Sequence, residues 1–384
     1  MPVCPYHQSC NGCQLWELSY SDQEAQKIAK LKELLRLKSL ALDEPIQFVS
    51  LGFSGLRQRA DLTVELAQNR EATLNFGFYD REYKLLDIEN CAQFSGELQT
   101  IYTEFRHIFS KNFRPKDLEF FQKGSLRLRV GANGEKGCWL DFSNLAIKNF
   151  LREKELLQNL QAHNFHIEIG QKGKSLSQDP LRLTEPVPRP WFKTWLSNKK
   201  EIQLNCLISD FTQASWAAAQ SMVQTTLEYA EFCKKSAGQQ LQMIEFGAGI
   251  GQFTLPLLSA GYQLTVYELS PSACDSLKLN STLHHLSDNL KVYTGDFQRS
   301  VDLKLEHTLD LALVNPSRSG LRQFTEALIN SGAKYLIYIS CFPESLTDDL
   351  KKLSLHYKLR NIKIIDQFPQ TKHFECAVFL EKLN

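Results

Sequence analysis

The spacing of apolar residues changes character about half-way along the 384-residue chain. Early in the chain, apolar positions recur at helical spacing over 22–42 and then alternate with polar positions over 60–66, 73–79 and 82–88. These patterns predict an amphipathic helix followed by an antiparallel meander. The expected mixed α+β domain is completed by strands at 125–130, 138–142 and 166–169 and a helix around 145–162.

The later part of the chain alternates apolar strands with amphipathic helices, which is typical of a parallel sheet with helical crossovers. A segment rich in Gly, Ser and Pro at 170–190 indicates a mobile loop or a domain boundary. We therefore predict an α+β domain over 1–205 and a doubly wound α/β domain over 206–384. The α/β domain is expected to start with a helix at 214–236, with strands at 241–246, 264–268, 290–294, 309–314 and 335–340.

Charge and composition narrow the possible classes of protein without selecting one. The 44 basic and 43 acidic residues leave a net charge of only +1, so the total gives no sign of nucleic-acid binding. Two basic runs interleaved with aromatic residues, 106–129 and 172–200, are either RNA contacts or solvated surface. The sequence shows neither a signal peptide nor an apolar stretch long enough to cross a bilayer, so we expect a cytoplasmic protein.

A run of cysteines near the start of the chain predicts a metal centre. Cys4, Cys10 and Cys13 lie close together in the sequence, Gly12 permits a tight turn between them, and Cys91 is the candidate fourth ligand. Thiolates suit zinc or an iron–sulfur cluster, and the spacing does not decide between the two. A chance clustering of structural cysteines is the alternative.

A glycine-rich turn after the strand at 241–246 predicts a nucleotide or cofactor site. Gly247 lets a ligand approach the backbone, and the helix that follows Gln252 offers free N–H groups. Glu268 ends the next strand, where its carboxylate can bind ribose hydroxyls. Asp296 follows the strand after that, as a contact to the adenine side or as a helix cap. The pattern suits nicotinamide nucleotides as well as S-adenosylmethionine.

Cys341 follows the strand at 335–340, and Pro343 opens a helix two residues later. The thiol is therefore predicted in a strand-to-helix turn, where open α/β sheets gather ligands and nucleophiles. On frequency alone, a cysteine after an apolar strand is more often a small core residue than a nucleophile. A carboxylate, Glu375, follows some thirty residues later and is the second candidate for chemistry.

Two linked motifs make the chain similar to a known family. Residues 340–349 fit S-C-x-P-x-[ST]-L-x-x-D, and residues 366–375 fit D-x-F-P-x-T-x-H-x-E. Together they resemble the C-terminal signature of the RNA uracil-5-methyltransferases. The resemblance implies a Rossmann-like class I methyltransferase domain that binds S-adenosylmethionine. It also implies that Cys341 is the nucleophile and Glu375 the base, with His373 as a second candidate for the base.

Further segments extend the resemblance. Residues 210–215 resemble the F-x-Q segment that places a glutamine over the methyl donor. Residues 315–320 resemble the N-P-P-R-x-G loop, except that Ser317 replaces the second proline, which puts the rigidity of the loop in question. Asn315 would also read the edge of the uracil. The implied donor site comprises Gln213, Gly247, Gln252, Glu268, Asp296 and Asn315.

The N-terminal part resembles one branch of that family. The cysteine run is similar to the [4Fe-4S] region of the 23S rRNA-specific members, which implies an iron–sulfur cluster rather than zinc on Cys4, Cys10, Cys13 and Cys91.

The same resemblance implies the substrate. The N-P-x-R loop, with no OB-like domain before the cysteines, indicates a shorter type that acts on 23S rRNA, and we expect a monomer. Arg57 and Arg59 lie in a segment similar to the family's aromatic and arginine stretch and are candidate phosphate contacts, with surface ion pairing as the alternative. The competing functions are a tRNA uracil-5-methyltransferase, a non-catalytic iron–sulfur RNA-binding protein and an NAD-dependent oxidoreductase.

Overall fold

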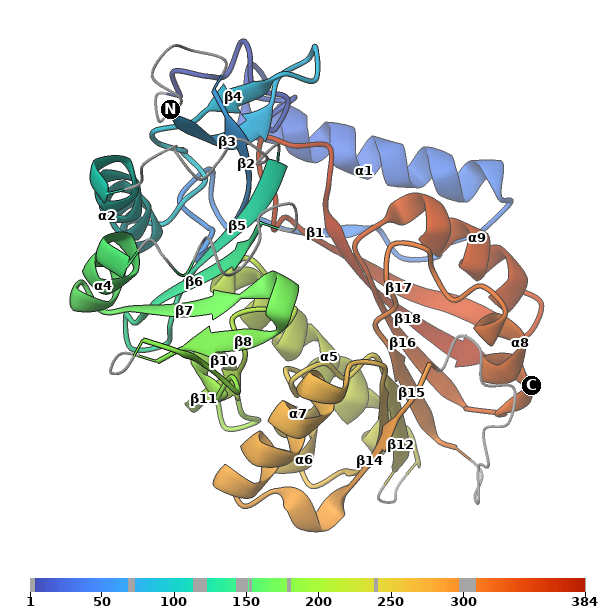
Figure 1. Cartoon of the computed structure of the whole chain (residues 1–384). Helices are drawn as coiled ribbons and strands as arrows, with labels where there is room; N and C mark the ends of the chain where they lie inside the picture. The colour runs from blue at the N-terminus through green and yellow to red at the C-terminus, as the bar shows by residue number, and fades with distance from the viewer. Residues whose placement is uncertain are drawn as a thin grey trace. The chain divides into compact units, whose positions relative to one another are not determined.

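The computed structural model describes residues 4–67, 73–112, 123–142, 151, 154–177, 181–237, 241–296 and 309–383. The chain forms two compact units (Figure 1), and each unit collects separate stretches of sequence. The first comprises Met1–Trp16, Phe53–Phe192 and Cys206–Asp210, and the second Glu17–Gly52, Lys193–Asn205 and Phe211–Asn384. We expected a single border after residue 205. The chain instead crosses between the units several times, and residues 17–52 fold with the C-terminal part.

In the described part of the chain, the first unit contains an eight-stranded sheet in the order β4-β3-β2-β5-β6-β7-β8-β9. Antiparallel pairing of β2 (Arg59–Leu66), β3 (Leu74–Tyr79) and β4 (Leu85–Asp87) confirms the predicted meander. The sheet continues with β5 (Lys123–Val130), β6 (Lys136–Asp141), β7 (Phe165–Ile169), β8 (Lys174–Leu176) and β9 (Leu183–Thr184).

Aromatic side chains join this sheet to α2 (Gly96–Asn112), and α4 (Lys154–Ala162) packs beside α2 and β7. Phe105 and Phe109 of α2 meet Phe76 of β3 edge to face, with ring centroids 5.8 and 5.4 Å apart, an arrangement that aromatic quadrupoles favour. The helix expected around 145–162 is present as α4, and 145–150 and 152–153 lie outside the described residues.

The segment expected to be a loop or boundary is partly regular. Residues 170–177 form the short 3₁₀ helix η2 (Gly170–Lys172) and strand β8, with Gly173 in the left-handed conformation at a φ of 57°. Residues 178–180 lie outside the described residues. A two-stranded hairpin of β10 (Arg189–Trp195) and β11 (Glu201–Cys206) follows.

The second unit contains, among the described residues, an eight-stranded sheet in the order β1-β17-β18-β16-β15-β12-β13-β14. Parallel pairing from β16 to β14 confirms the predicted sheet. Two strands that the sequence did not suggest, β17 and β18, extend the sheet with antiparallel pairing, and β1 forms the edge parallel to β17. The strands are β1 (Gln47–Val49), β12 (Gln242–Phe246), β13 (Gln263–Glu268), β14 (Leu290–Thr294), β15 (Leu311–Val314), β16 (Tyr335–Ser340), β17 (Tyr357–Ile365) and β18 (Glu375–Lys382).

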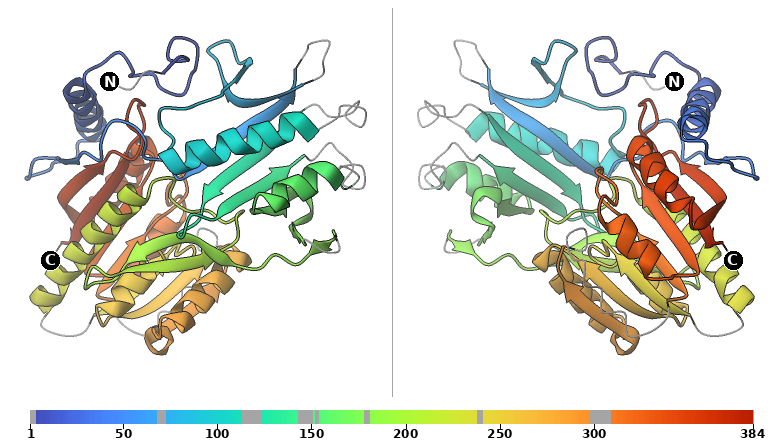
Figure 2. Two further views of the ribbon diagram at one scale, coloured as in Figure 1. Left: turned by 90° about the vertical axis from the view of Figure 1, so that its left-hand side faces the viewer. Right: turned by 90° about the vertical axis from the view of Figure 1, so that its right-hand side faces the viewer.

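Helices cover both faces of this second sheet. Along β18, Val378 joins the core that contains Leu31 of α1 (Tyr20–Leu37) and Leu350 of α9 (Pro343–Leu353). The next residue, Phe379, points the other way and stacks on Tyr229 of α5 (Trp216–Ala237) at 5.1 Å. Figure 2 shows α5 on the face opposite α9 and α8 (Phe324–Asn330). The unit also holds α6 (Thr254–Ser259) and α7 (Pro271–Leu283).

Helix α1 belongs to this unit because its polar contacts are made with the loop between β17 and β18. Gln23 is buried on the inner face of α1, donates to Gln370 Oε1 at 2.9 Å and accepts from the Gln370 backbone at 2.9 Å. After α1, the chain returns to the sheet and adds β1 parallel to β17. The predicted helix at 22–42 therefore exists, but it ends at Leu37 and supports the sheet edge.

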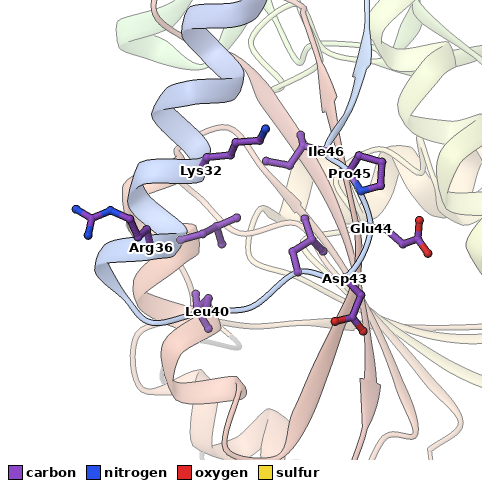
Figure 3. A pocket seen from close by; sticks show the side chains of 9 residues that line it. Lys32, Arg36, Leu40, Asp43, Glu44, Pro45 and Ile46 are labelled. Atoms are coloured by element: carbon purple, nitrogen blue, oxygen red, sulfur yellow. The ribbon is translucent and has the colours of Figure 1, made fainter.

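A pocket of about 540 Å³ lies where α1 ends (Figure 3). Apolar side chains such as Leu40 and Ile46 line it, and Lys32, Arg36 and Asp43 add charged groups. Its lining residues all come from α1 and the segment that follows, and they include none of the predicted site residues.

The basic run at 106–129 is largely engaged within the first unit. Arg106 pairs with Asp87 at 2.7 Å, and Arg127 pairs with Asp61 at 2.5 Å. Arg129 is 1% exposed and donates to main-chain carbonyl groups. The aromatic residues of the basic run, Phe113, Phe120 and Phe121, lie outside the described residues. Buried and paired cations are poor phosphate contacts. Lys111 and Lys123 of the same run are exposed, so the RNA-binding role of this run stays a prediction.

The remaining predicted RNA contacts are also paired in part. Arg59 donates to Asp61 at 2.9 Å, and burial lowers the pKa of Arg59 to about 10. In the run at 172–200, Lys193 pairs with Glu201 at 3.0 Å. Among the described helices, none combines the length and the apolar character that crossing a bilayer requires.

Candidate active site

Cys341 occupies the turn between β16 and α9, as predicted. Strand β16 is buried along its whole length, and Pro343 starts α9 two residues after the thiol. The backbone N–H of Phe342 donates to Ser340 Oγ at 3.3 Å, which helps to fix the turn. The Cys341 side chain is half-buried and is a free thiol.

Glu375 is the first residue of β18, which lies beside β16 in the sheet. The antiparallel register places Ser340 opposite Cys376. The next residue outward on each strand, Cys341 and Glu375, therefore reaches the same edge of the sheet. The Glu375 side chain is only 3% exposed. Strand pairing thus brings together a thiol and a carboxylate that are far apart in the sequence.

Arg318, from the loop after β15, interacts with both groups. Its guanidinium donates a hydrogen bond to the Cys341 thiol. Burial raises the pKa of Cys341, and the Glu375 carboxylate raises it further, whereas Arg318 lowers it. Arg318 also opposes the rise in the pKa of Glu375 that burial causes. A positive charge here favours the thiolate and the carboxylate together.

The carboxyl group of Glu375 is suited to exchange a proton near neutral pH. Burial raises its pKa to about 7, and the Arg318 charge and a hydrogen bond from Gln367 act against that rise. A general base works best when its pKa is close to the working pH. The sequence motif singles out Glu375 as a candidate base, and burial explains why the pKa of its carboxyl group is close to neutral.

The glycine-rich turn lies against the end of β15. Gly247 has a φ of 78°, and a Cβ atom there would come within 2.5 Å of the Asn315 carbonyl oxygen. The Asn315 backbone N–H in turn donates to the Phe246 carbonyl at 3.0 Å. Glycine is required at 247 because the backbone of Asn315 occupies the space of a side chain. Two predicted donor-site residues are therefore adjacent.

Two more predicted donor-site residues flank this turn. The Gly249 N–H and the Ser270 N–H each donate to the Glu268 carboxylate at 2.8 Å, which holds it at the end of β13. The Gln252 side-chain nitrogen is buried and has no hydrogen-bond partner in the described part of the chain. A buried donor left without a partner is costly unless a ligand satisfies it. Asp296 lies half-buried just after β14.

Gln213 is linked to Glu375 through another glutamine. The Gln367 side-chain nitrogen donates to Gln213 Oε1 at 2.8 Å and to Glu375 Oε1 at 3.1 Å. All three side chains are buried. Gln213, Gln367 and Glu375 thus form one hydrogen-bonded group.

The chain matches the family model for tRNA (uracil-5-)-methyltransferase over residues 152–383. This chain belongs to that family. A methyltransferase of Bdellovibrio bacteriovorus, described as an uncharacterized RNA methyltransferase, is 34% identical and aligns over 99% of this chain and 95% of its own length. The 23S rRNA (uracil(1939)-C(5))-methyltransferase RlmD of Vibrio parahaemolyticus is 24% identical over 99% of this chain and 82% of the relative.

A solved structure of the same family shows a similar fold. The tRNA (uracil-54, C5)-methyltransferase of Pyrococcus abyssi, in complex with S-adenosyl-L-homocysteine, superposes with a TM-score of 0.70. It is 19% identical, and the match covers 99% of this chain and 87% of that one. The second unit is therefore the expected Rossmann-like methyltransferase domain. The protein is an S-adenosylmethionine-dependent RNA uracil-5-methyltransferase.

In the methyltransferase, Asp349 stabilises the loop that carries Arg318. Asp349 of α9 accepts from the Leu321 N–H at 2.7 Å and from the Tyr338 hydroxyl at 2.7 Å. Gly320 has a φ of 71°, and a Cβ atom there would lie 2.4 Å from the same carboxylate. The final Asp of the S-C-x-P-x-[ST]-L-x-x-D motif thus supports the neighbouring loop.

Ser317, where the methyltransferase departs from the expected second proline, is exposed. The turn around it is closed by a hydrogen bond from the Gly320 N–H to the Ser317 carbonyl at 3.0 Å, and Pro316 is buried. Together with Asp349, these contacts fix the loop without a second proline.

Two residues of the methyltransferase that interact with the predicted site residues were not predicted from the sequence as site residues. Arg318 was present only as a motif letter, and Gln367 carries no sequence signal, because nothing in its spacing indicates that it faces Gln213. The side chain of His373, the second candidate base, is exposed as a whole, and partial desolvation of its ring and the Arg318 charge lower its pKa.

The four N-terminal cysteines of the methyltransferase lie in its first unit as free, half-buried thiols. Burial raises the pKa of Cys13 to about 12, with contributions from Cys91, Cys10 and Cys4, while Arg57 lowers it. The structure therefore brings the four within electrostatic range of one another. Among the described residues, no group of three or more His, Cys, Asp or Glu side chains is placed to hold a metal ion.

Proposed function

We propose that the enzyme methylates C5 of a uridine in 23S rRNA, with Cys341 as nucleophile and Glu375 as base. The observation that carries the chemistry is the register of β16 and β18, which brings Cys341 and Glu375 to one edge of the sheet, where the Arg318 charge acts on both groups. The choice of substrate rests on the relatives named as 23S rRNA methyltransferases, which align over nearly the whole chain.

Uracil C5 is a poor nucleophile and needs activation. The Cys341 thiolate adds to C6 of the uracil ring, and the electron pair of the C5–C6 double bond moves to form an enolate. The carbanionic C5 then attacks the methyl group of S-adenosylmethionine. The methyl–sulfur bond breaks, and S-adenosylhomocysteine is the leaving group. Arg318 favours this first step because it stabilises the thiolate.

The adduct is resolved by removal of a proton. Glu375 takes the proton from C5, the C5–C6 double bond re-forms, and the C6–sulfur bond breaks to release the Cys341 thiolate. The base must be ionised to act, and a pKa of about 7 leaves much of Glu375 ionised at neutral pH. Asn315, beside the glycine-rich turn, is proposed to read the uracil edge, and the base must be flipped out of the RNA to reach it.

The family model and the Pyrococcus abyssi structure carry tRNA in their names, so tRNA is the second candidate substrate. Mapping of 5-methyluridine in ribosomal and transfer RNA from cells with and without the gene separates the two. Loss of one 5-methyluridine in 23S rRNA is expected. Loss from tRNA alone would overturn the choice of substrate and leave the chemistry intact.

The chemistry has its own test. Cys341→Ala should bind S-adenosylmethionine and RNA but yield neither product nor adduct, because no enolate forms. Glu375→Gln should methylate the RNA and remain bonded to it, so that the complex survives denaturing electrophoresis. Normal turnover by Glu375→Gln would make another group, His373 first, the base, and activity of Cys341→Ala would rule out nucleophilic catalysis by this thiol.

We propose in addition that Cys4, Cys10, Cys13 and Cys91 hold a [4Fe-4S] cluster. Support comes from the chemistry of the donor set, four thiols of one unit within electrostatic range of one another. Such a cluster would cross-link the N-terminal segment to the segment that follows β4.

Protein purified without oxygen should be brown and contain about four iron and four sulfide per chain. Cys13→Ser should lose most of the iron, whereas Cys138→Ala, a buried cysteine of the same unit, should keep it. One equivalent of zinc without iron or sulfide would contradict the proposal.

A further inference from the structure

Gln367 lies in the loop between β17 and β18, and 2% of it is exposed. Its side-chain nitrogen carries two hydrogens, and the structure directs this nitrogen at two acceptors, Gln213 Oε1 and Glu375 Oε1. Gln213 precedes α5, and Glu375 starts β18. One amide therefore joins the donor-side glutamine to the carboxylate proposed as the base.

We propose that Gln367 is a positioning residue that favours the ionised form of Glu375 against the effect of burial and ties its orientation to that of Gln213. The proposal rests on the function proposed above for Glu375. It assigns to Gln367 a role in the proton-removal step, through the group that it holds.

The hydrogen-bond pattern favours the carboxylate. If the Gln367 amide were turned over, its oxygen would face two acceptor oxygens, so the orientation with nitrogen inward is the one that satisfies both. A hydrogen bond to an ionised acceptor is about twice as strong as one to a neutral acceptor. The contact therefore acts against burial, which favours the neutral acid.

Within the described ranges, three other charged or titratable groups are found to act on Glu375 or to be affected by it. Arg318 reaches it from the loop after β15, Cys341 from the end of β16, and Cys376 is its neighbour on β18. Arg318 alone among these three carries a positive charge, and it is shared with the Cys341 thiol. Gln367 thus adds a direct hydrogen bond to the effect of the Arg318 charge, and both favour the ionised form of Glu375.

Gln367→Met tests this role, because methionine has a similar shape and no N–H group. In single-turnover reactions, release of methylated RNA from the covalent adduct should depend on pH through Glu375. For Gln367→Met the acid limb should move upward by about one pH unit, which is roughly a tenfold slower release below the limb, with rates that converge at high pH. Binding of S-adenosylhomocysteine should weaken by a factor of roughly 3 to 10, because Gln213 loses its donor.

Gln370→Met is the matched control. Gln370 is also buried, lies in the same loop, and accepts from Gln23 of α1 at 2.9 Å. This variant should lose stability and leave the acid limb where the wild type has it. If Gln367→Met does not fold, Gln367→Asn keeps the amide on a shorter side chain and should shift the limb in the same direction.

The outcomes separate the two proposals. Wild-type enzyme that forms no adduct, and Glu375→Gln that traps none, would remove the proposed function before Gln367 is considered. With an active wild type, an unshifted acid limb in the Gln367 variants, or an equal loss of rate at every pH, would overturn the role of Gln367 alone.

Discussion

The Lys27 ammonium lies 2.7 Å from a carboxylate oxygen of Asp366, and neither side chain is more than 2% exposed. The Tyr20 hydroxyl donates to the other oxygen of Asp366 at 3.1 Å. Asp366 is the first residue of the motif that ends in Glu375. Helix α1 is therefore bound to the loop that leads into β18, the strand that starts with Glu375.

Lys27→Met should destabilise the second unit strongly, because it leaves the Asp366 carboxylate buried beside a neutral side chain. Loss of one partner from a buried pair costs about 3–5 kcal/mol. Urea unfolding of Lys27→Met and of the wild type measures this change in the free energy of unfolding. Lys27→Met combined with Asp366→Leu should recover part of the loss.

Lys30→Met is the control on the same helix. Lys30 pairs with Glu344 at 2.7 Å, but the two side chains are 37% and 39% exposed, so its replacement should cost at most about 1 kcal/mol. Equal losses for the two lysine variants would show that burial does not set the strength of the Lys27 pair.

The sequence was informative where one segment carries its own pattern. The period-two runs predicted β2 and β3, and the strand that ends at Ser340 placed Cys341 in its turn. Helix α1 was also predictable, but not its partner, because apolar spacing shows that a helix has a buried face and not which sheet covers it.

The rest depended on contacts between distant segments. Strand β18 reads as a continuous apolar run, buried on both faces, and so lacks the alternation that marks a half-buried strand. Pairing of β18 with β16 is what sets Glu375 beside Cys341. The burial of Arg129 at the end of the basic run 106–129 is likewise a property of the folded sheet that the sequence does not show.

Gly247→Ala should abolish measurable binding of S-adenosylhomocysteine, because the new methyl group would lie 2.5 Å from the backbone oxygen of Asn315 and push two strand ends apart. Calorimetric titration checks this. Gly261→Ala is the control, since its φ of 84° is similar but no atom lies within 4 Å of the new Cβ. It should cost about 1 kcal/mol of stability and leave the affinity unchanged. Full affinity in Gly247→Ala would place the donor elsewhere.

Asp349→Ala should slow methyl transfer without removing any group that touches the substrate. It leaves the Leu321 N–H and the Tyr338 hydroxyl without their acceptor and frees the loop that carries Arg318. A misplacement of about 1 Å can cost roughly a hundredfold in rate. The adjacent Asp348→Ala removes only an exposed pair with Lys38 and should retain the wild-type rate. Similar single-turnover rates for the two variants would argue against support of the loop by Asp349.

Glu375 should also govern how stability depends on pH. Its pKa in the folded protein, about 7, lies above the ordinary value of 4.5, so the folded state prefers the protonated form. The resulting stabilisation is fully present below about pH 4.5 and is lost as the pH rises through 7. Glu375→Gln keeps a neutral group at this position.

The variant should therefore match the wild type near pH 4.5 and exceed it by roughly 3 kcal/mol at pH 8. Urea unfolding across this range gives the difference between the two proteins, in which groups common to both cancel. A difference that stays constant with pH would mean that Glu375 ionises in the folded protein as readily as in the unfolded chain. In that case burial would not be what tunes the base.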